Sequence, residues 1–120
     1  MTIQDIQFQL MEEASFNGFN GKQVVRDLKA HPELWQGVVM DRAGYGGCIS
    51  LIKLRDISEN YWNVDTVYIL AKKGKENELY DLAETWNADE IDWIPDKEAQ
   101  RALGSWGPSR EQQLLRVWWD

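Results

Sequence analysis

The side chains best suited to binding a small anion lie in two short segments. Lys72, Lys73 and Lys75 precede a predicted helix, whose free N–H groups would favour a phosphate or a carboxylate. In the second segment, Arg42 could form a bidentate contact and Tyr45 could offer a stacking face. Neither segment has the spacing of a phosphate-binding or dinucleotide-binding loop. A solvated turn and an ordinary hairpin loop are the alternative interpretations.

Carboxylates are the main candidates for acid–base chemistry, because paired carboxylates near strand ends can transfer protons or bind a metal. Five aspartates lie at or near the predicted strand ends: Asp41, Asp56, Asp65, Asp89 and Asp92. Helix caps and ion pairs use the same residue type, and no spacing distinguishes a catalytic pair. The sequence therefore assigns no catalytic residue.

Metal and nucleophile motifs are missing from the sequence. One histidine, His31, and one cysteine, Cys48, exclude a zinc site within one chain, since such sites usually need three or four of these ligands. No Gly-x-Ser-x-Gly nucleophile elbow occurs. We predict no metal and no cofactor, and the sequence favours a protein without catalytic activity.

Aromatic side chains are the main candidates for contact with a partner, since the chain has seven tryptophans in 120 residues. Tyr61, Trp62 and Trp106 lie in predicted loops, and Trp and Tyr are enriched at interface hot spots. The alternative is that these rings fold back over the core. Trp118 and Trp119 are consecutive in a predicted strand, so their side chains must point to opposite faces.

Negative charge is concentrated in residues 76–98, which contain nine acids against the single base Lys97. Such an acidic face either keeps the protein in solution or docks a basic partner. If it docks a partner, four of its side chains are the predicted steering charges: Glu76, Glu84, Asp89 and Glu90.

These features are compatible with three functions. The leading prediction is a small acidic protein that binds another protein through the loop aromatics and the acidic face, as an inhibitor or regulatory domain does. The alternative is a protein, or an enzyme, that binds a small anionic ligand at the carboxyl ends of parallel strands, through the three lysines, Arg42 and Tyr45. A structural subunit whose aromatics contact copies of itself is a third interpretation, so a homo-oligomer is compatible with the sequence.

Net charge and hydropathy exclude other partners. A net charge of −7 disfavours nucleic acid, because binding to its backbone uses Lys and Arg. No apolar segment approaches the roughly 18 residues of a membrane span, and the N-terminus lacks the basic and apolar run of a signal peptide. We expect a cytoplasmic protein that does not contact a membrane.

The N-terminal part of the sequence predicts two helices. Thr2 and Asp5 have the spacing of a capping box ahead of a helical apolar pattern, and Asn20 and Gln23 have the same spacing ahead of a second one. Residues 31–37 predict one further helical turn.

From residue 38 onward the apolar residues follow the spacing expected of strands and no longer that of helices. Residues 38–41 and 49–54 flank a glycine-rich connection, which predicts a β-hairpin. In residues 64–71 the side chains that would point to either face of a strand are mostly apolar, as expected of a central strand that is covered on both faces. A helix follows, with its apolar stripe at Leu79 and Trp86.

The C-terminal part predicts a strand at 91–94, a helix at 95–104 and a last strand at 114–119. A β-α-β-α-β order predicts parallel strands. We therefore expect one domain over residues 1–120, of the α+β or α/β class, with a mixed sheet of about five strands and helices on both faces or mainly on one. A chain that ends inside a sheet predicts a domain that is complete at Asp120.

Overall fold

The computed structural model describes residues 1–41, 57–95 and 113–120. Its helices and strands are α1 (Ile3–Glu12), α2 (Gly21–Ala30), β1 (Trp35–Asp41), β2 (Thr66–Ala71), α4 (Glu76–Glu84), β3 (Glu90–Trp93) and β4 (Leu114–Trp118), with short 3-10 turns at Phe16–Gly18 and Pro32–Leu34. Several predictions fall on residues that are not described: the strand at 49–54, nearly all of the helix at 95–104, Arg42, Tyr45, Cys48, Asp56 and Trp106.

Local sequence signals place the beginnings of both N-terminal helices. The Thr2 hydroxyl accepts a hydrogen bond from the Asp5 N–H at 3.0 Å, and the Asp5 carboxylate accepts one from the Thr2 N–H at 2.8 Å. This reciprocal pair is the predicted capping box of α1. At the start of α2 the Asn20 side chain accepts from the Gln23 N–H at 3.1 Å. Both helix starts are confirmed.

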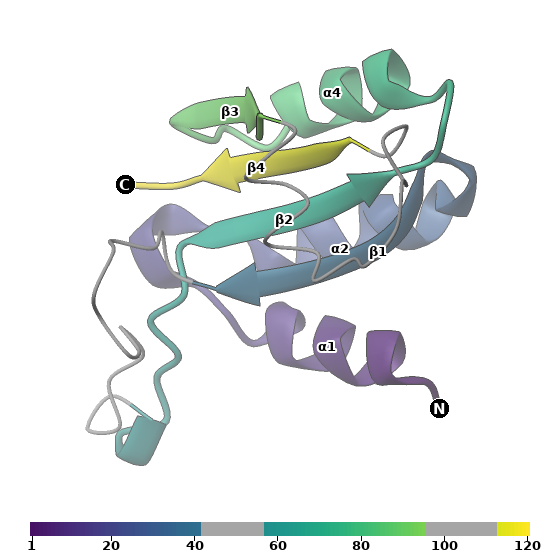
Figure 1. Ribbon diagram of the computed structural model, residues 1–120. Helices are drawn as coiled ribbons and strands as arrows, with labels where there is room; N and C mark the ends of the chain where they lie inside the picture. The colour runs from purple at the N-terminus through teal and green to yellow at the C-terminus, as the bar shows by residue number, and fades with distance from the viewer. Residues whose placement is uncertain (42–56, 96–112) are drawn as a thin grey trace.

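The four strands of the described sheet lie in the order β1-β2-β4-β3, and every neighbouring pair is antiparallel. β2 lies between β1 and β4, which confirms a central strand within the predicted range 64–71, although the strand itself begins at Thr66. The predicted five strands and parallel β-α-β pairing are wrong. β2 and β3 do point the same way, as the intervening helix led us to expect, but β4 runs between them in the opposite direction (Figure 1).

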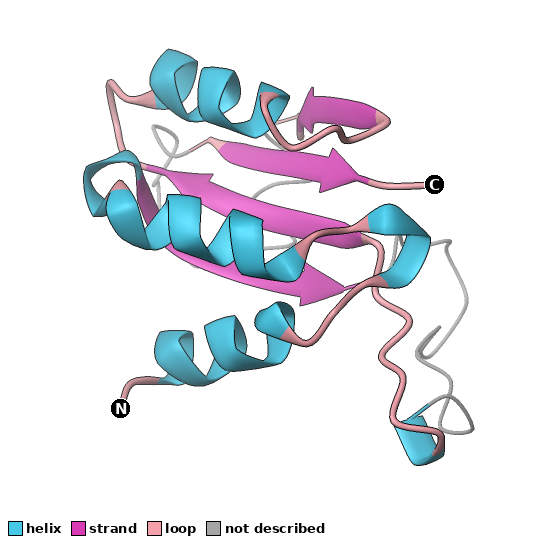
Figure 2. Ribbon diagram, turned by 180° about the vertical axis from the view of Figure 1, so that it is seen from behind, coloured by secondary structure: helices cyan, strands magenta, loops and turns pink. Residues whose placement is uncertain are grey.

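The described helices and the sheet enclose one apolar core. α2 crosses one face of the sheet, α1 lies next to β1, and α4 lies at the opposite edge, next to β3 and β4 (Figures 1 and 2). The core combines residues of all three helices with the inward-facing residues of the strands: Phe8, Met11, Val24, Val25, Leu28, Val38, Met40, Val67, Ile69, Leu79, Ala83, Leu115, Val117 and Trp119. No helix in the described part of the chain is long and apolar enough to cross a bilayer.

The outer edge of β1 is covered by side chains of α1. The Gln4 side chain accepts from the Val38 N–H at 2.8 Å and donates to the Val38 carbonyl at 2.9 Å, and the Gln7 side chain accepts from the Met40 N–H at 2.9 Å. These two amides take the place of a neighbouring strand for the N–H and C=O of Val38 and the N–H of Met40.

Candidate functional site

The acidic segment forms one edge of the folded protein. Between residues 76 and 95 there is no Lys or Arg. The acids of this stretch define what we call the acidic edge: Glu76, Glu78, Asp81, Glu84, Asp89, Glu90 and Asp92. They lie on α4, on β3 and in the connection between the two elements, which are neighbours at the same end of the sheet (Figure 1). The structure therefore brings together all four predicted steering charges.

An aromatic pocket lies within the acidic edge. Tyr80 of α4 and Trp93 of β3 are stacked, with ring centroids 6.4 Å apart and an angle of 28° between the ring planes. Together with Asn77 and Asp81 they line an open pocket of about 550 Å³, which we call the Tyr80–Trp93 pocket. Aromatic faces next to a carboxylate suit the ammonium of a lysine or the guanidinium of an arginine.

One arginine neutralises part of the acidic edge. The Arg116 guanidinium contacts Asp92 at 2.8 Å and Glu90 at 3.2 Å, and it lies 5.7 Å from the centre of the Trp118 ring. Burial opposes the charged form of Arg116, but the hydrogen bonds to both carboxylates outweigh burial and raise its pKa. These contacts lie on β3 and β4, away from Asp81, which forms no ion pair in the described part of the chain.

Other acids of the edge also have local partners. Glu78 pairs with Lys75 at 3.6 Å, and the Asp89 carboxylate accepts from the Asp120 N–H at 2.7 Å. Glu84, on the last turn of α4, forms no ion pair among the residues that the structure describes. Within the described part of the chain, Asp81 and Glu84 are therefore the acids of this edge with neither an ion pair nor a hydrogen-bond partner for the carboxylate.

The indole groups separate structural tryptophans from candidate binding residues. Four of the six described tryptophans donate an indole hydrogen bond within the protein: Trp35 to the Leu28 carbonyl, Trp86 to Asp27, Trp118 to Asp65 and Trp119 to the Trp86 carbonyl, at 2.8–3.3 Å. Trp62 and Trp93 make no such bond in the described structure, and each lines a pocket. Buried indoles normally find a partner, so these two N–H groups can serve a ligand.

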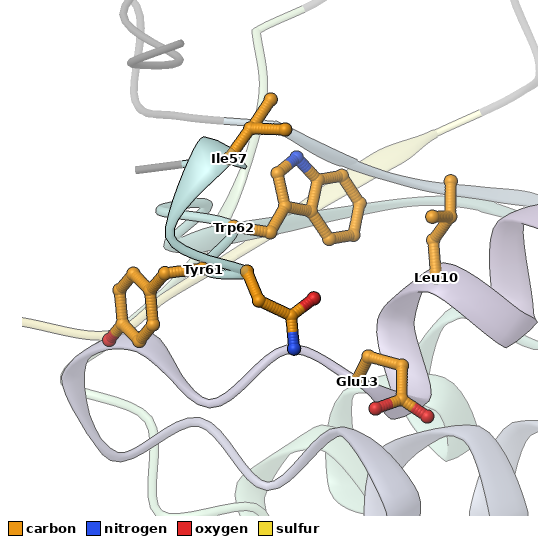
Figure 3. Close-up of a pocket in the computed structure, with 6 residues that line it drawn as sticks. Leu10, Glu13, Ile57, Tyr61 and Trp62 are labelled. Carbon is orange, nitrogen blue, oxygen red and sulfur yellow. The ribbon is translucent and has the colours of Figure 1, made fainter. Parts of the chain in front are cut away.

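The pocket at Trp62 lies on a different part of the molecule. Leu10 of α1 and Glu13, the residue after this helix, form one side, and Ile57 and Trp62 form the other, with Tyr61 at the rim (Figure 3). Its volume is about 420 Å³, and Asn60 completes the lining among the described residues. Figure 3 shows the Trp62 ring over the space between the two sides.

Two of the three predicted loop aromatics, Tyr61 and Trp62, are described, and they differ in burial. Tyr61 is 40% exposed and touches Phe16 edge-on, with ring centroids 5.9 Å apart. Trp62 is half-buried and packs against the core. Trp62 thus combines the two interpretations that the sequence left open, because one part of its ring covers the core and another lines the pocket.

The predicted anchors and the predicted steering charges do not form one surface. Residues 57–62 lie at the end of the molecule opposite to α4 and β3 (Figure 1). Tyr61 and Trp62 therefore cannot contact the same short segment of a partner as the acidic edge. Trp106, the third predicted anchor, lies outside the described residues.

The lysines of the predicted anion site do not lie at the carboxyl ends of parallel strands. Lys72 and Lys73 are exposed in the turn between β2 and α4, but the sheet is antiparallel, so this turn is not at the carboxyl ends of parallel strands. Local acids also occupy the turn. The Glu76 carboxylate accepts from the Gly74 N–H at 3.2 Å, and the neighbouring Lys75 is paired with Glu78. Anion binding by these lysines remains an untested prediction.

Sequence reasoning missed Tyr80 and the role of Trp93. Asn77, Tyr80 and Asp81 have the i, i+3, i+4 spacing that places side chains on one face of a helix, away from the buried Leu79 and Ala83. That spacing was readable, but Trp93 is 12 residues beyond Asp81. Only the fold shows that the strand and the helix are neighbours.

Among the described residues, no group of three or more His, Cys, Asp or Glu side chains could hold a metal ion. No family model matches the chain, and neither the search of curated proteins nor that of solved structures found a match.

Proposed function

We propose that this protein binds a basic protein partner through the acidic edge and the Tyr80–Trp93 pocket, as a non-catalytic regulatory or inhibitory domain. The observation that carries the proposal is the position of the pocket: its two aromatic faces and the Asp81 carboxylate lie in a stretch of chain with seven acids and no base. A lysine or arginine of the partner is the side chain that this combination fits best.

The charges and the pocket make different contributions. Exposed ion pairs contribute only about 0–1 kcal/mol each, but a field of one sign accelerates the encounter with an oppositely charged partner. Glu76, Glu84, Asp89 and Glu90 keep the steering role that the sequence predicted. Affinity needs a desolvated anchor, and a cation held against an aromatic face supplies about 0.5–2 kcal/mol.

The pocket at Trp62 supports a second, separate contact. Its lining is mostly apolar, and Leu10, Ile57 and Tyr61 are each 40–49% exposed. A partner large enough to reach both ends of the molecule could use it. In this proposal Tyr61 and Trp62 remain anchors, but of a contact that does not share its surface with the acidic edge.

The test uses a short labelled peptide of alternating arginine and valine as the basic probe, with binding followed by fluorescence anisotropy at low salt. Tyr80→Ala removes one aromatic wall, and Asp81→Asn removes the carboxylate. We expect each change to weaken binding by about tenfold, which corresponds to about 1.4 kcal/mol.

The chain offers matched controls for both substitutions. Tyr61→Ala removes an exposed aromatic ring elsewhere, and Glu13→Gln removes one charge at the pocket of Figure 3. These two variants should bind the probe nearly as well as the wild-type protein. Absence of binding by the wild-type protein, or equal losses in test and control variants, would reject the acidic edge as the binding surface.

A further inference from the structure

The outer edge of β3 presents unpaired backbone groups. β3 is the last strand of the order β1-β2-β4-β3. The Ile94 N–H bonds to the Leu114 carbonyl at 2.9 Å, and the ladder pairs Asp92 with Arg116. Because alternate residues of an antiparallel strand bond the same neighbour, Ile91 and Trp93 direct their N–H and C=O groups away from β4.

Nothing in the described structure occupies this edge. No described residue hydrogen-bonds the outward backbone groups of Ile91 and Trp93, and α4, the described helix beside the end of β3, meets this strand through the stacked rings of Tyr80 and Trp93 (Figure 1). The β1 edge is different, because Gln4 and Gln7 satisfy its backbone there. Among the described residues, side chains of α1 cover the β1 edge, and none covers the backbone of the β3 edge, which can accept an additional strand.

The open edge and the Tyr80–Trp93 pocket share one residue. Trp93 directs its backbone toward the edge, and its ring stacks on Tyr80 beside Asp81. In a strand paired with this edge, the residue opposite Trp93 would have its Cβ about 4.5–5.5 Å from that of Trp93. Its side chain would lie on the same face of the sheet as the pocket and within reach of it.

The charges of β3 select the kind of strand that can pair. Glu90 and Asp92 lie on the face of β3 opposite to Ile91 and Trp93, and each side chain is 54% exposed beside Arg116. A strand with basic side chains on that face would meet these two carboxylates, whereas an acidic strand would be repelled. Charge complementarity thus favours a basic segment at this edge.

We propose that the basic partner binds as an extended segment that adds a strand to the outer edge of β3 and places a lysine or arginine in the Tyr80–Trp93 pocket. This inference rests on the proposed function and specifies its binding mode. Strand addition derives affinity from main-chain hydrogen bonds and specificity from pockets for alternate side chains. Both features are present at β3, and the pocket opens at the strand residue whose backbone faces outward.

The decisive comparison is between the alternating arginine–valine peptide and the same peptide with N-methyl groups on its backbone amides. N-methylation keeps every charge and side chain but removes the N–H donors that a strand needs. We expect the N-methylated peptide to bind at least tenfold more weakly, since each hydrogen bond contributes about 0.5–1.5 kcal/mol.

Amide hydrogen exchange of the whole protein supplies a second readout that needs no destabilising variant. On binding the unmethylated peptide, the Ile91 and Trp93 amides should exchange more slowly, because the added strand accepts their hydrogen bonds. The Tyr61 amide, at the other end of the molecule, is the internal control and should be unchanged.

The outcomes separate this inference from the proposed function. Equal binding of both peptides, with the Tyr80 and Asp81 dependence intact, overturns strand addition and leaves the proposed function standing. Unchanged exchange at Ile91 and Trp93 overturns strand addition too. If neither peptide binds the wild-type protein, both proposals are wrong. Selective loss on N-methylation together with slowed exchange at β3 supports strand addition.

Discussion

At the scale of single residues, hydrogen bonding distinguishes the tryptophans better than their position in loops or strands does. The sequence singled out Trp62 because it lies in a loop, and the structure places it at a pocket. Trp93 was assigned only to a strand, yet it lines the pocket of the acidic edge. Both indoles lack a bond in the described structure. That property depends on neighbours in space, so no pattern in the sequence could reveal it.

Tyr68 provides a prediction at this scale. The residue is half-buried on β2, and burial raises the pKa of its hydroxyl, outweighing the opposite effect of nearby Arg116. The unfolded chain, with a tyrosine pKa of 10.0, loses its proton first as the pH rises. The folded state then holds more protons than the unfolded state, so Tyr68 contributes stability below about pH 10 that is lost above it.

We expect Tyr68→Phe to reduce the loss of stability on going from neutral to alkaline pH. The measurement is the free energy of unfolding in urea at a series of pH values around 10. Tyr61→Phe, at an exposed tyrosine, is the matched control and should follow the wild-type protein. Identical pH dependence of the Tyr68→Phe variant and the wild-type protein would contradict this account.

At the scale of elements, the sequence located most helices and strands but not the strand pairing. Thr2 with Asp5, and Asn20 with Gln23, marked the helix starts because caps are local hydrogen bonds. Burial on both faces marked β2 as central. An apolar pattern reports what covers a strand and not which strand lies beside it, so the insertion of β4 between β2 and β3 was not predictable.

The cover on the β1 edge gives a prediction for α1. Replacing both Gln4 and Gln7 by alanine leaves the backbone groups of Val38 and Met40 without their side-chain partners. We expect the free energy of unfolding to fall by about 1–3 kcal/mol, measured by urea denaturation. Gln9→Ala, at an exposed position of the same helix, should change it by less than about 0.5 kcal/mol.

Comparing the Gln4→Ala/Gln7→Ala double variant with Gln9→Ala separates the loss of the glutamine hydrogen bonds from the effect of alanine on helix propensity. Alanine is the best helix former, so its effect on α1 itself is favourable at all three positions. A double variant as stable as Gln9→Ala would show that the glutamine amides do not stabilise the edge.

At the scale of the whole molecule, the uneven distribution of charge could be predicted, but its relation to the aromatics could not. The net charge of −7 and the acid-rich segment are properties of the sequence. The distance between the acidic edge and the Tyr61 region depends on how the chain folds, and the structure places these groups at opposite ends (Figure 1). The loop aromatics and the acids, which the sequence analysis assigned to one binding surface, therefore lie on two separate surfaces.

Repulsion within the acidic edge predicts a response to salt. Raising the ionic strength from 0.01 M to 0.15 M shortens the Debye length from about 30 Å to about 8 Å, which screens like charges. We expect the thermal midpoint of unfolding to rise over this range. Glu84→Lys, which places a base among the acids, should raise the midpoint at low salt and weaken its salt dependence.

Glu13→Lys is the comparison for this variant, because Glu13 lies at the C-terminal end of α1 and Glu84 at that of α4, while the change in net charge is the same. A smaller effect at Glu13 is expected, since fewer acids surround it. A midpoint of the wild-type protein that falls with added salt would show that attractive ion pairs dominate the fold instead.

The difference between the two edges of the sheet also bears on polymerisation. Continuous growth of a ribbon of molecules requires the β3 edge of one copy to pair with the β1 edge of the next. Gln4 and Gln7 occupy the β1 edge, so the β3 edge of another copy cannot pair with it. Pairing between two β3 edges would bring Glu90 and Asp92 of both copies together and would end with two molecules. A concentrated solution of the folded protein should therefore form no fibres, even though no described residue covers the backbone of its β3 edge.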